Sequence, residues 1–233
     1  MFSGASSTGT FVSLPLSQYP RSPAKFLQYQ WARYRSWLEG SLSVLQVKLR
    51  SMPSWTRRPR WRAARRRIAP AAKALYREVL EAFAQGDRAT LSRVCVRAFG
   101  TRLIAAVDRR SPRERVRFDL VRYNRPLLYP RLLSHRIHAV NPHDRDSATE
   151  QAVVAIASTQ QASRHSFDTG ALIPGSLKLQ DKIEYVVLSR NLNVKTYESS
   201  PWRVWGTTSA TSLDEYVKEQ AALEKEQAQR AGF

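Results

Sequence analysis

Apolar side chains recur at every third or fourth position over residues 24–52, which is the spacing of one face of an α-helix. Either one helix or two helices that meet at Gly40 fit this pattern. Two placements are open: a helix docked on the main domain or on a partner protein, and a basic amphipathic helix at a membrane surface or on RNA. The apolar stripe consists of Leu27, Trp31, Tyr34, Leu38, Leu42, Leu45, Leu49 and Met52.

A helical period returns after a block of arginines. Pro70 is suited to the first turn of a helix, where a missing N–H costs nothing. Gly86 suits the residue after the end of that helix, and Asp87 suits the N-cap of a second one. We expect Gly100 to close the second helix, and a third short helix to follow over Thr101–Arg109.

From about residue 116 the apolar period changes towards two, which is typical of β-strands. A stretch with two glycines and a proline at 166–180 predicts a long hairpin connection. Ser212 and Glu215 have the spacing of a capping box at the start of a last helix. The strands are expected at 116–121, 132–140, 151–163, 182–192 and 202–205.

Helices, then strands, then a helix is the order of an α+β fold, with N-terminal helices packed on a curved antiparallel sheet of about four to six strands. The chain divides into five parts. They are an extended N-terminal arm at 1–23, an amphipathic helical segment at 24–52, an arginine-rich linker at 53–69, an α+β domain at 70–212 and a C-terminal helix at 213–233.

The 233 residues carry a formal net charge of +19, which favours a polyanionic partner such as nucleic acid or an anionic membrane surface. Residues 1–125 hold 26 basic and 7 acidic side chains, whereas residues 126–233 hold 12 of each. The whole excess therefore lies in the first half. A hydrophobic content of 42% is too high for a wholly disordered basic tail.

Seven of the eleven residues at 57–67 are arginine, whose planar guanidinium suits phosphate contacts. Trp61 stands among them, where an indole could stack on an unpaired base or lie at a lipid interface. A solvated basic linker and a nuclear import signal are the alternative interpretations. The residues expected to contact RNA are Arg57, Arg58, Arg60, Trp61, Arg62, Arg65, Arg66 and Arg67, with Lys48 and Arg50.

Cys95 is the only cysteine, so the chain cannot form an internal disulfide or a multi-cysteine metal cluster. Its position on an apolar helical face predicts a buried, inert thiol. We expect no metal and no other cofactor. Apolar runs such as 153–157 are far shorter than the ~20 residues of a spanning helix.

Two stretches carry a resemblance to a known family. Residues 74–91 form a helix, a Gly-Asp break and a short helix, and 202–207 followed by 211–216 form a closing strand and helix. Both resemble the superfamily named after the forty-four-kilodalton matrix subunit of the mitochondrial inner-membrane translocase, whose fold is a cone like that of nuclear transport factor two. The resemblance spans roughly residues 9–225.

The N-terminal segment resembles one branch of that superfamily. Gly9-Thr10-Phe11-Val12, Leu14-Pro15, Tyr19–Pro23 and the stretch 24–52 are similar to the branch that contains a mitochondrial large-ribosomal-subunit protein and the fungal inner-membrane ribosome receptor. The import-motor branch carries a long charged coiled-coil-like region instead. The stretch at 166–180 is a departure from the family, and the dense arginine run favours RNA contact.

The resemblance implies a non-enzymatic protein of the mitochondrial matrix, peripheral to the inner membrane. Its partners would be ribosomal RNA, neighbouring large-subunit proteins near the exit tunnel, the inner-membrane surface and an insertase, with no small-molecule substrate. It would help to attach the ribosome to the membrane for co-translational insertion. The side chains expected to face the membrane or a partner are Phe26, Trp31, Tyr34 and Trp37.

Two other functions are weighed against this one. An import-motor adaptor of the translocase is the first. The second is a cone-fold isomerase or dehydratase, with Asp119, Tyr123, His135 and His138 as candidate acids or bases. The two histidines are three positions apart, so on one strand they point to opposite faces, and neither has a carboxylate at suggestive spacing. The sequence therefore favours a binding protein.

Overall fold

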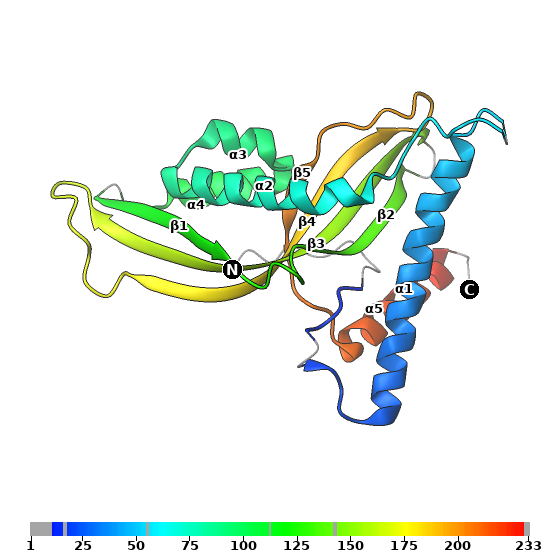
Figure 1. The fold of residues 1–233 in the computed structure, drawn as a ribbon, viewed down its shortest axis with the longest axis horizontal. Helices are drawn as coiled ribbons and strands as arrows, with labels where there is room; N and C mark the ends of the chain where they lie inside the picture. Colours follow the sequence, from blue (N-terminus) through cyan, green and yellow to red (C-terminus); the bar gives the residue numbers. More distant parts are fainter. Residues whose placement is uncertain (1–10, 16–17, 55, 112, 142–143, 231–233) are drawn as a thin grey trace.

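The computed structural model describes residues 11–15, 18–54, 56–111, 113–141 and 144–230. Within these residues the fold is α+β, as expected, with five helices and a five-stranded open antiparallel sheet (Figure 1). In chain order the elements are α1 (Pro23–Arg50), α2 (Arg65–Gln85), α3 (Arg88–Val94), α4 (Arg97–Asp108), β1 (Glu114–Tyr123), β2 (Arg131–Asn141), β3 (Asp144–Ser166), β4 (Lys178–Asn193), β5 (Arg203–Thr208) and α5 (Leu213–Arg230).

The sheet is organised around β3, which is 23 residues long. β2 pairs with the first half of β3 and β1 with the second half, so both lie along the same edge of that strand. β4 pairs along the other edge, and β5 pairs with β4. All five expected strands are confirmed. The first four are wider than the pattern predicted, β3 by seven residues at its start, and β5 is shifted towards the C-terminus.

Helices α2, α3 and α4 cover one face of the sheet (Figure 1). Ile68, Ala72, Tyr76 and Val79 of α2 recur at helical spacing and are buried against alternate residues of β3 and β4. Cys95 is buried in the same core, as expected, and burial raises the pKa of its thiol to about 12. A nucleophilic role at neutral pH is therefore disfavoured.

The expected helix ends are only partly correct. Gly86 has a φ of +75° after α2, and the Asp87 side chain accepts a hydrogen bond of 3.0 Å from Thr90 N, which confirms the cap. The predicted start at Pro70 is wrong because Ile68 packs in the core and α2 already begins at Arg65. The predicted end at Gly100 is also wrong, since Gly100 lies inside α4.

Helix α1 is continuous through Gly40 and docks through the face opposite the predicted stripe. Its buried residues are mostly small: Tyr29, Ala32, Ser36, Gly40 and Val44. They let α1 approach β2 so closely that a Cβ on Gly40 would lie 3.0 Å from the carbonyl oxygen of His135. The break considered at Gly40 is therefore a point of close packing.

The described part of the arm fastens α1 and α5 to the domain. Val12 and Thr211 exchange hydrogen bonds, with the backbone of Thr211 donating to Val12 O at 2.8 Å. Leu14 N donates to the Tyr29 hydroxyl at 2.6 Å. Phe11 packs edge-on against Tyr29 and Tyr216. The predicted capping box is present, because Ser212 and Glu215 bond each other's backbone N–H.

Candidate nucleic-acid interface and the cleft beside it

The arginines of 57–67 form an exposed basic segment, by which we mean Arg57, Arg58, Arg60, Arg62, Arg65, Arg66 and Arg67. All seven are exposed, and none forms an ion pair with a described residue. Lys48 and Arg50, in the last turn of α1, are exposed as well. Guanidinium groups with no acidic partner keep their charge and donors for a ligand.

Trp61 does not share this exposure, which corrects the role predicted for it. Only 3% of its surface is accessible, and it packs with Val44 of α1, Ile137 of β2 and Leu192 of β4. The indole therefore holds the basic segment onto the domain and cannot stack on a base. Arg60 N donates to Ser51 O at 3.1 Å, which fixes the turn next to it.

A buried charge cluster lies in the sheet near this anchor. Glu150 is fully buried on β3, with His135 Nε2 2.8 Å from one carboxylate oxygen and Arg190 Nε donating to the other at 2.7 Å. Arg190 also stacks on the Trp202 ring, 4.3 Å from its centroid. A carboxylate beside His135 was not expected from the sequence, because Glu150 is fifteen residues away along the chain. Because both oxygens are paired, removal of either partner would leave an uncompensated buried charge in the sheet.

The four candidate catalytic residues do not meet. His135 is bonded to Glu150, whereas His138 lies on the opposite face of β2, where burial and then the charge of Arg136 lower its pKa. Lys73 lies over the Tyr123 ring. Asp119 lines a separate cavity of about 820 Å³ between α2, α4 and β1, whose wall mixes acids and bases. The four candidates therefore do not form an acid–base pair with one another around one substrate position.

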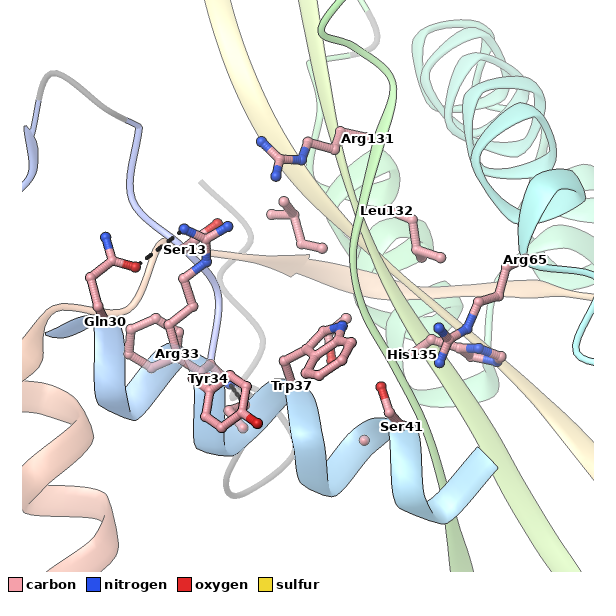
Figure 2. A pocket seen from close by; sticks show the side chains of 15 residues that line it. Ser13, Gln30, Arg33, Tyr34, Trp37, Ser41, Arg65, Arg131, Leu132 and His135 are labelled. Atoms are coloured by element: carbon pink, nitrogen blue, oxygen red, sulfur yellow. Dashed lines mark hydrogen bonds between the residues drawn. The ribbon is translucent and has the colours of Figure 1, made fainter. Parts of the chain in front are cut away.

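A second cavity, of about 450 Å³, lies between α1, the arm, the start of β2 and the first residue of α2 (Figure 2). We call it the basic cleft. It is lined by arginines, aromatic rings, serines and small or apolar residues, and none of its described lining residues is acidic. The lining residues are Phe11, Ser13, Gln30, Arg33, Tyr34, Ser36, Trp37, Gly40, Ser41, Arg65, Arg131, Leu132, Leu133, Ser134 and His135.

The outer face of α1, turned away from the sheet, exposes the apolar stripe predicted from the sequence. Trp31 is 67% exposed and Tyr34 51%. Trp37 lies at the edge of this face beside the basic cleft and is 56% exposed, and neighbouring ring centroids in this row lie 6.0 Å apart. Phe26 is 38% exposed and packs against Tyr19. Leucines continue the face towards the end of the helix: Leu38, Leu42, Leu45 and Leu49.

Comparison with known proteins adds no assignment: the chain matches no family model and no curated protein. Among the described residues, no three His, Cys, Asp or Glu side chains gather as a metal site would require. None of the described helices combines the length and hydropathy needed to cross a bilayer.

The sequence identified the basic segment and the aromatic half of α1 but missed the basic cleft. Arg33 and Trp37 are four residues apart on α1, a spacing that already places them on one side of the helix. Arg131 comes from β2, nearly a hundred residues later, and only the fold brings it to them.

Proposed function

We propose that this chain is a non-enzymatic adaptor that binds ribosomal RNA through its basic segment and contacts a membrane surface through the outer face of α1. The observation that carries the proposal is the exposed basic segment, whose seven arginines have no acidic partner among the described residues. Phosphate contacts of this kind supply affinity without reading sequence.

The outer face of α1 supports the second contact. It exposes two indoles and several leucines on one side of a helix of 28 residues, which is about 42 Å long. An amphipathic helix with aromatic and aliphatic side chains on one face can lie in the interface of a bilayer. Arg21, Lys25 and Arg35, at or near the aromatic half, are exposed and complement an anionic surface.

The two contacts lie at different places along α1. The most exposed apolar side chains of the outer face, Leu27 and Trp31, lie in the first half of α1, whereas the basic segment begins beyond its last turn at Arg50. A rigid helix between two anchors would hold RNA and membrane at a set distance from each other. This arrangement suits a protein that attaches a ribonucleoprotein particle to a membrane.

The cellular setting of the proposal rests on the family resemblance. The chain would be a component or receptor of the mitochondrial large ribosomal subunit, on the matrix side of the inner membrane near the polypeptide exit. There it would help co-translational insertion of mitochondrially encoded proteins, next to neighbouring subunit proteins and an insertase.

The test is sedimentation of a mitochondrial extract in sucrose gradients at low and high salt, with carbonate extraction of the membranes in parallel. We expect the chain to travel with the large subunit at low salt and to leave the membranes on carbonate extraction. Retention on the subunit after a high-salt wash indicates a permanent component, and loss indicates a detachable receptor. Co-purification with the import translocase and not with ribosomes would overturn the proposal in favour of an import-motor adaptor.

A further inference from the structure

The basic cleft gathers three arginines from three separate elements. Arg33 comes from α1, Arg65 from the start of α2 and Arg131 from the start of β2, and Figure 2 shows them placed around Trp37. Arg33 donates to the Tyr19 hydroxyl at 3.1 Å. Arg65 and Arg131 make no hydrogen bond or ion pair with a described residue, so their donors are available to an anion.

One wall of the cleft is aromatic. Trp37 and Tyr34 both line it, with their rings tilted by 30° and more than half of each side chain exposed. An exposed indole beside guanidinium groups accepts a flat ring by stacking, and every nucleobase offers such a face. The cleft thus combines a stacking surface with phosphate-binding groups.

The opposite wall is polar. It includes the hydroxyl of Ser134 and the side chain of His135, which is 98% buried. Its Nε2 lies 2.8 Å from a carboxylate oxygen of Glu150. Nδ1 is buried and has no partner among the described residues. The hydroxyl of Ser134 therefore gives this wall a group that can donate or accept, next to the donors of the arginines.

The volume of the cleft and its position beside the basic segment limit the class of ligand further. A volume of about 450 Å³ is in the range of sites for small molecules or single ligand groups. Arg65 belongs both to the cleft and to the basic segment, so an RNA strand on that segment passes the mouth of the cleft. An acyl chain would need an apolar channel, whereas this lining carries three arginines and several hydroxyl groups.

We propose that the basic cleft binds one unstacked nucleotide of single-stranded RNA. Its base lies against Trp37, and Arg65 and Arg131 bind the phosphates on its two sides. The inference rests on the proposed function, because it names a site for part of the same RNA. It adds a preference for unpaired RNA that the basic segment alone does not provide, since phosphate contacts are available on duplex and single strand alike.

The decisive variants are Trp37→Leu and, as its matched control, Trp31→Leu. Both tryptophans are exposed on α1, but only Trp37 lines the cleft. The full chain is titrated with a fluorescent uridine oligonucleotide and with an RNA duplex of equal length. We expect Trp37→Leu to weaken single-strand binding roughly 5- to 100-fold, the loss typical of one stacked base, and to leave duplex binding unchanged. Trp31→Leu should bind both RNAs as the parent chain does.

A second variant tests the phosphate contact. Arg131→Ala should weaken binding of the uridine oligonucleotide and reduce the dependence of log affinity on log salt by roughly 0.7, the contribution of one phosphate contact on a single strand. Thermal melts followed by circular dichroism establish that each variant is folded. Unchanged single-strand affinity in both folded Trp37→Leu and folded Arg131→Ala would overturn the cleft.

The RNA titrations distinguish an error in the cleft proposal from an error in the proposed function. Replacing Arg57, Arg58, Arg60 and Arg62 by Gln should weaken the binding of both RNAs, because these residues contact phosphate on duplex and single strand alike. They lie outside the cleft, so this variant tests the basic segment alone. If that variant binds both RNAs normally, the proposed function is wrong. If that variant binds both RNAs more weakly while Trp37→Leu and Arg131→Ala leave single-strand affinity unchanged, only the cleft proposal is wrong. Arg131→Ala, which lies in the cleft and off the outer face of α1, is also titrated with vesicles of phosphatidylcholine and phosphatidylglycerol, and a loss of vesicle binding without a loss of RNA binding would assign the cleft to a lipid headgroup instead.

Discussion

At the scale of single residues, small side chains decide how α1 is attached. Ala32, Ser36 and Gly40 recur every four residues on the buried face of α1. Ala32 packs with Phe11 and Tyr216, whereas Ser36 and Gly40 face β2, where Arg136 donates to the Ser36 hydroxyl at 2.6 Å. Ser43 Oγ accepts from Ile137 N at 3.1 Å, so the helix also satisfies a backbone group of β2. Close approach and these hydrogen bonds replace the large apolar contacts that the sequence pattern favoured.

Enlarging Gly40 should separate the helix from the strand. Gly40→Val places its first carbon 3.0 Å from the His135 carbonyl, so we expect the free energy of unfolding to fall by about 1–3 kcal/mol. Urea denaturation measures the change. Gln46→Val, at an exposed position of the same helix, carries the same helix-propensity cost and should change stability by only about 0.5 kcal/mol. Equal losses in the two variants would contradict the close contact.

Trp61 is predicted to act on stability and not on RNA. Trp61→Ala removes a buried indole and should lower the free energy of unfolding by about 3–5 kcal/mol. Trp61→Phe keeps an aromatic ring in the site and should remain folded with unchanged affinity for RNA. A loss of RNA affinity in folded Trp61→Phe, measured by fluorescence anisotropy, would restore the stacking role that the sequence suggested.

Burial of Glu184 predicts that the stability of the folded chain falls as pH rises. Burial raises the pKa of its carboxyl above the ordinary value of 4.5. The neutral form is therefore favoured in the folded chain, and its stabilising effect is lost as pH rises from about that value through the folded pKa. Glu184→Gln keeps an acceptor for Gln160, which donates to Glu184 at 2.8 Å. We expect this variant to be more stable than the parent at neutral pH and equal at acid pH, measured by urea denaturation across pH. A parent and variant with parallel pH profiles would be inconsistent with a raised pKa.

At the scale of elements, α1 has two apolar faces with different uses. The face of small residues packs on β2, and the face of large residues is left exposed. Hydrophobic periodicity located the helix correctly but indicated the wrong buried side. A pattern of large apolar side chains does not reveal a face of small residues on which two backbones can approach closely. The fit of a glycine against one carbonyl depends on a strand almost a hundred residues away.

The exposed face should contribute to membrane binding and little to stability. Leu27→Ala together with Trp31→Ala removes two side chains that are 68% and 67% exposed, so the melting temperature should hardly change. Co-sedimentation with vesicles that contain phosphatidylglycerol should fall, because the face loses its largest apolar area. Gln28→Ala with Gln46→Ala is the control on the same helix. Normal vesicle binding by the first pair would show that this face docks on a protein instead.

At the scale of the whole molecule, charge and fold are divided along the chain. The arm, α1 and the basic segment belong to the strongly basic first half, whereas most of the sheet belongs to the neutral second half. The sheet and α2 serve as the support on which α1 and the basic segment are held, chiefly through Trp61 and β2. Nucleic-acid affinity should therefore depend on where arginines lie and not only on their number.

Two variants of equal net charge test this. Arg57, Arg58, Arg60 and Arg62 are replaced by Gln in one, and the exposed Arg97, Arg102, Arg109 and Arg117 in the other. The first variant loses four phosphate contacts, each of which contributes roughly 0.7 to 0.9 to the slope of log affinity against log salt. The magnitude of that slope should therefore fall by roughly 3. The second should leave the slope close to that of the parent. Equal reductions would mean that RNA is bound by overall charge.

The sequence by itself determined the helices and strands, the caps at Asp87 and Ser212, and the position of the charge, because period, caps and composition are local properties. Tertiary structure alone decided that Trp61 is buried, that His135 meets Glu150 and that Arg33, Arg65 and Arg131 line one cleft. Each of these depends on groups far apart in the chain, whose approach is set by packing and by the register of β2 and β3. A local pattern cannot encode that approach.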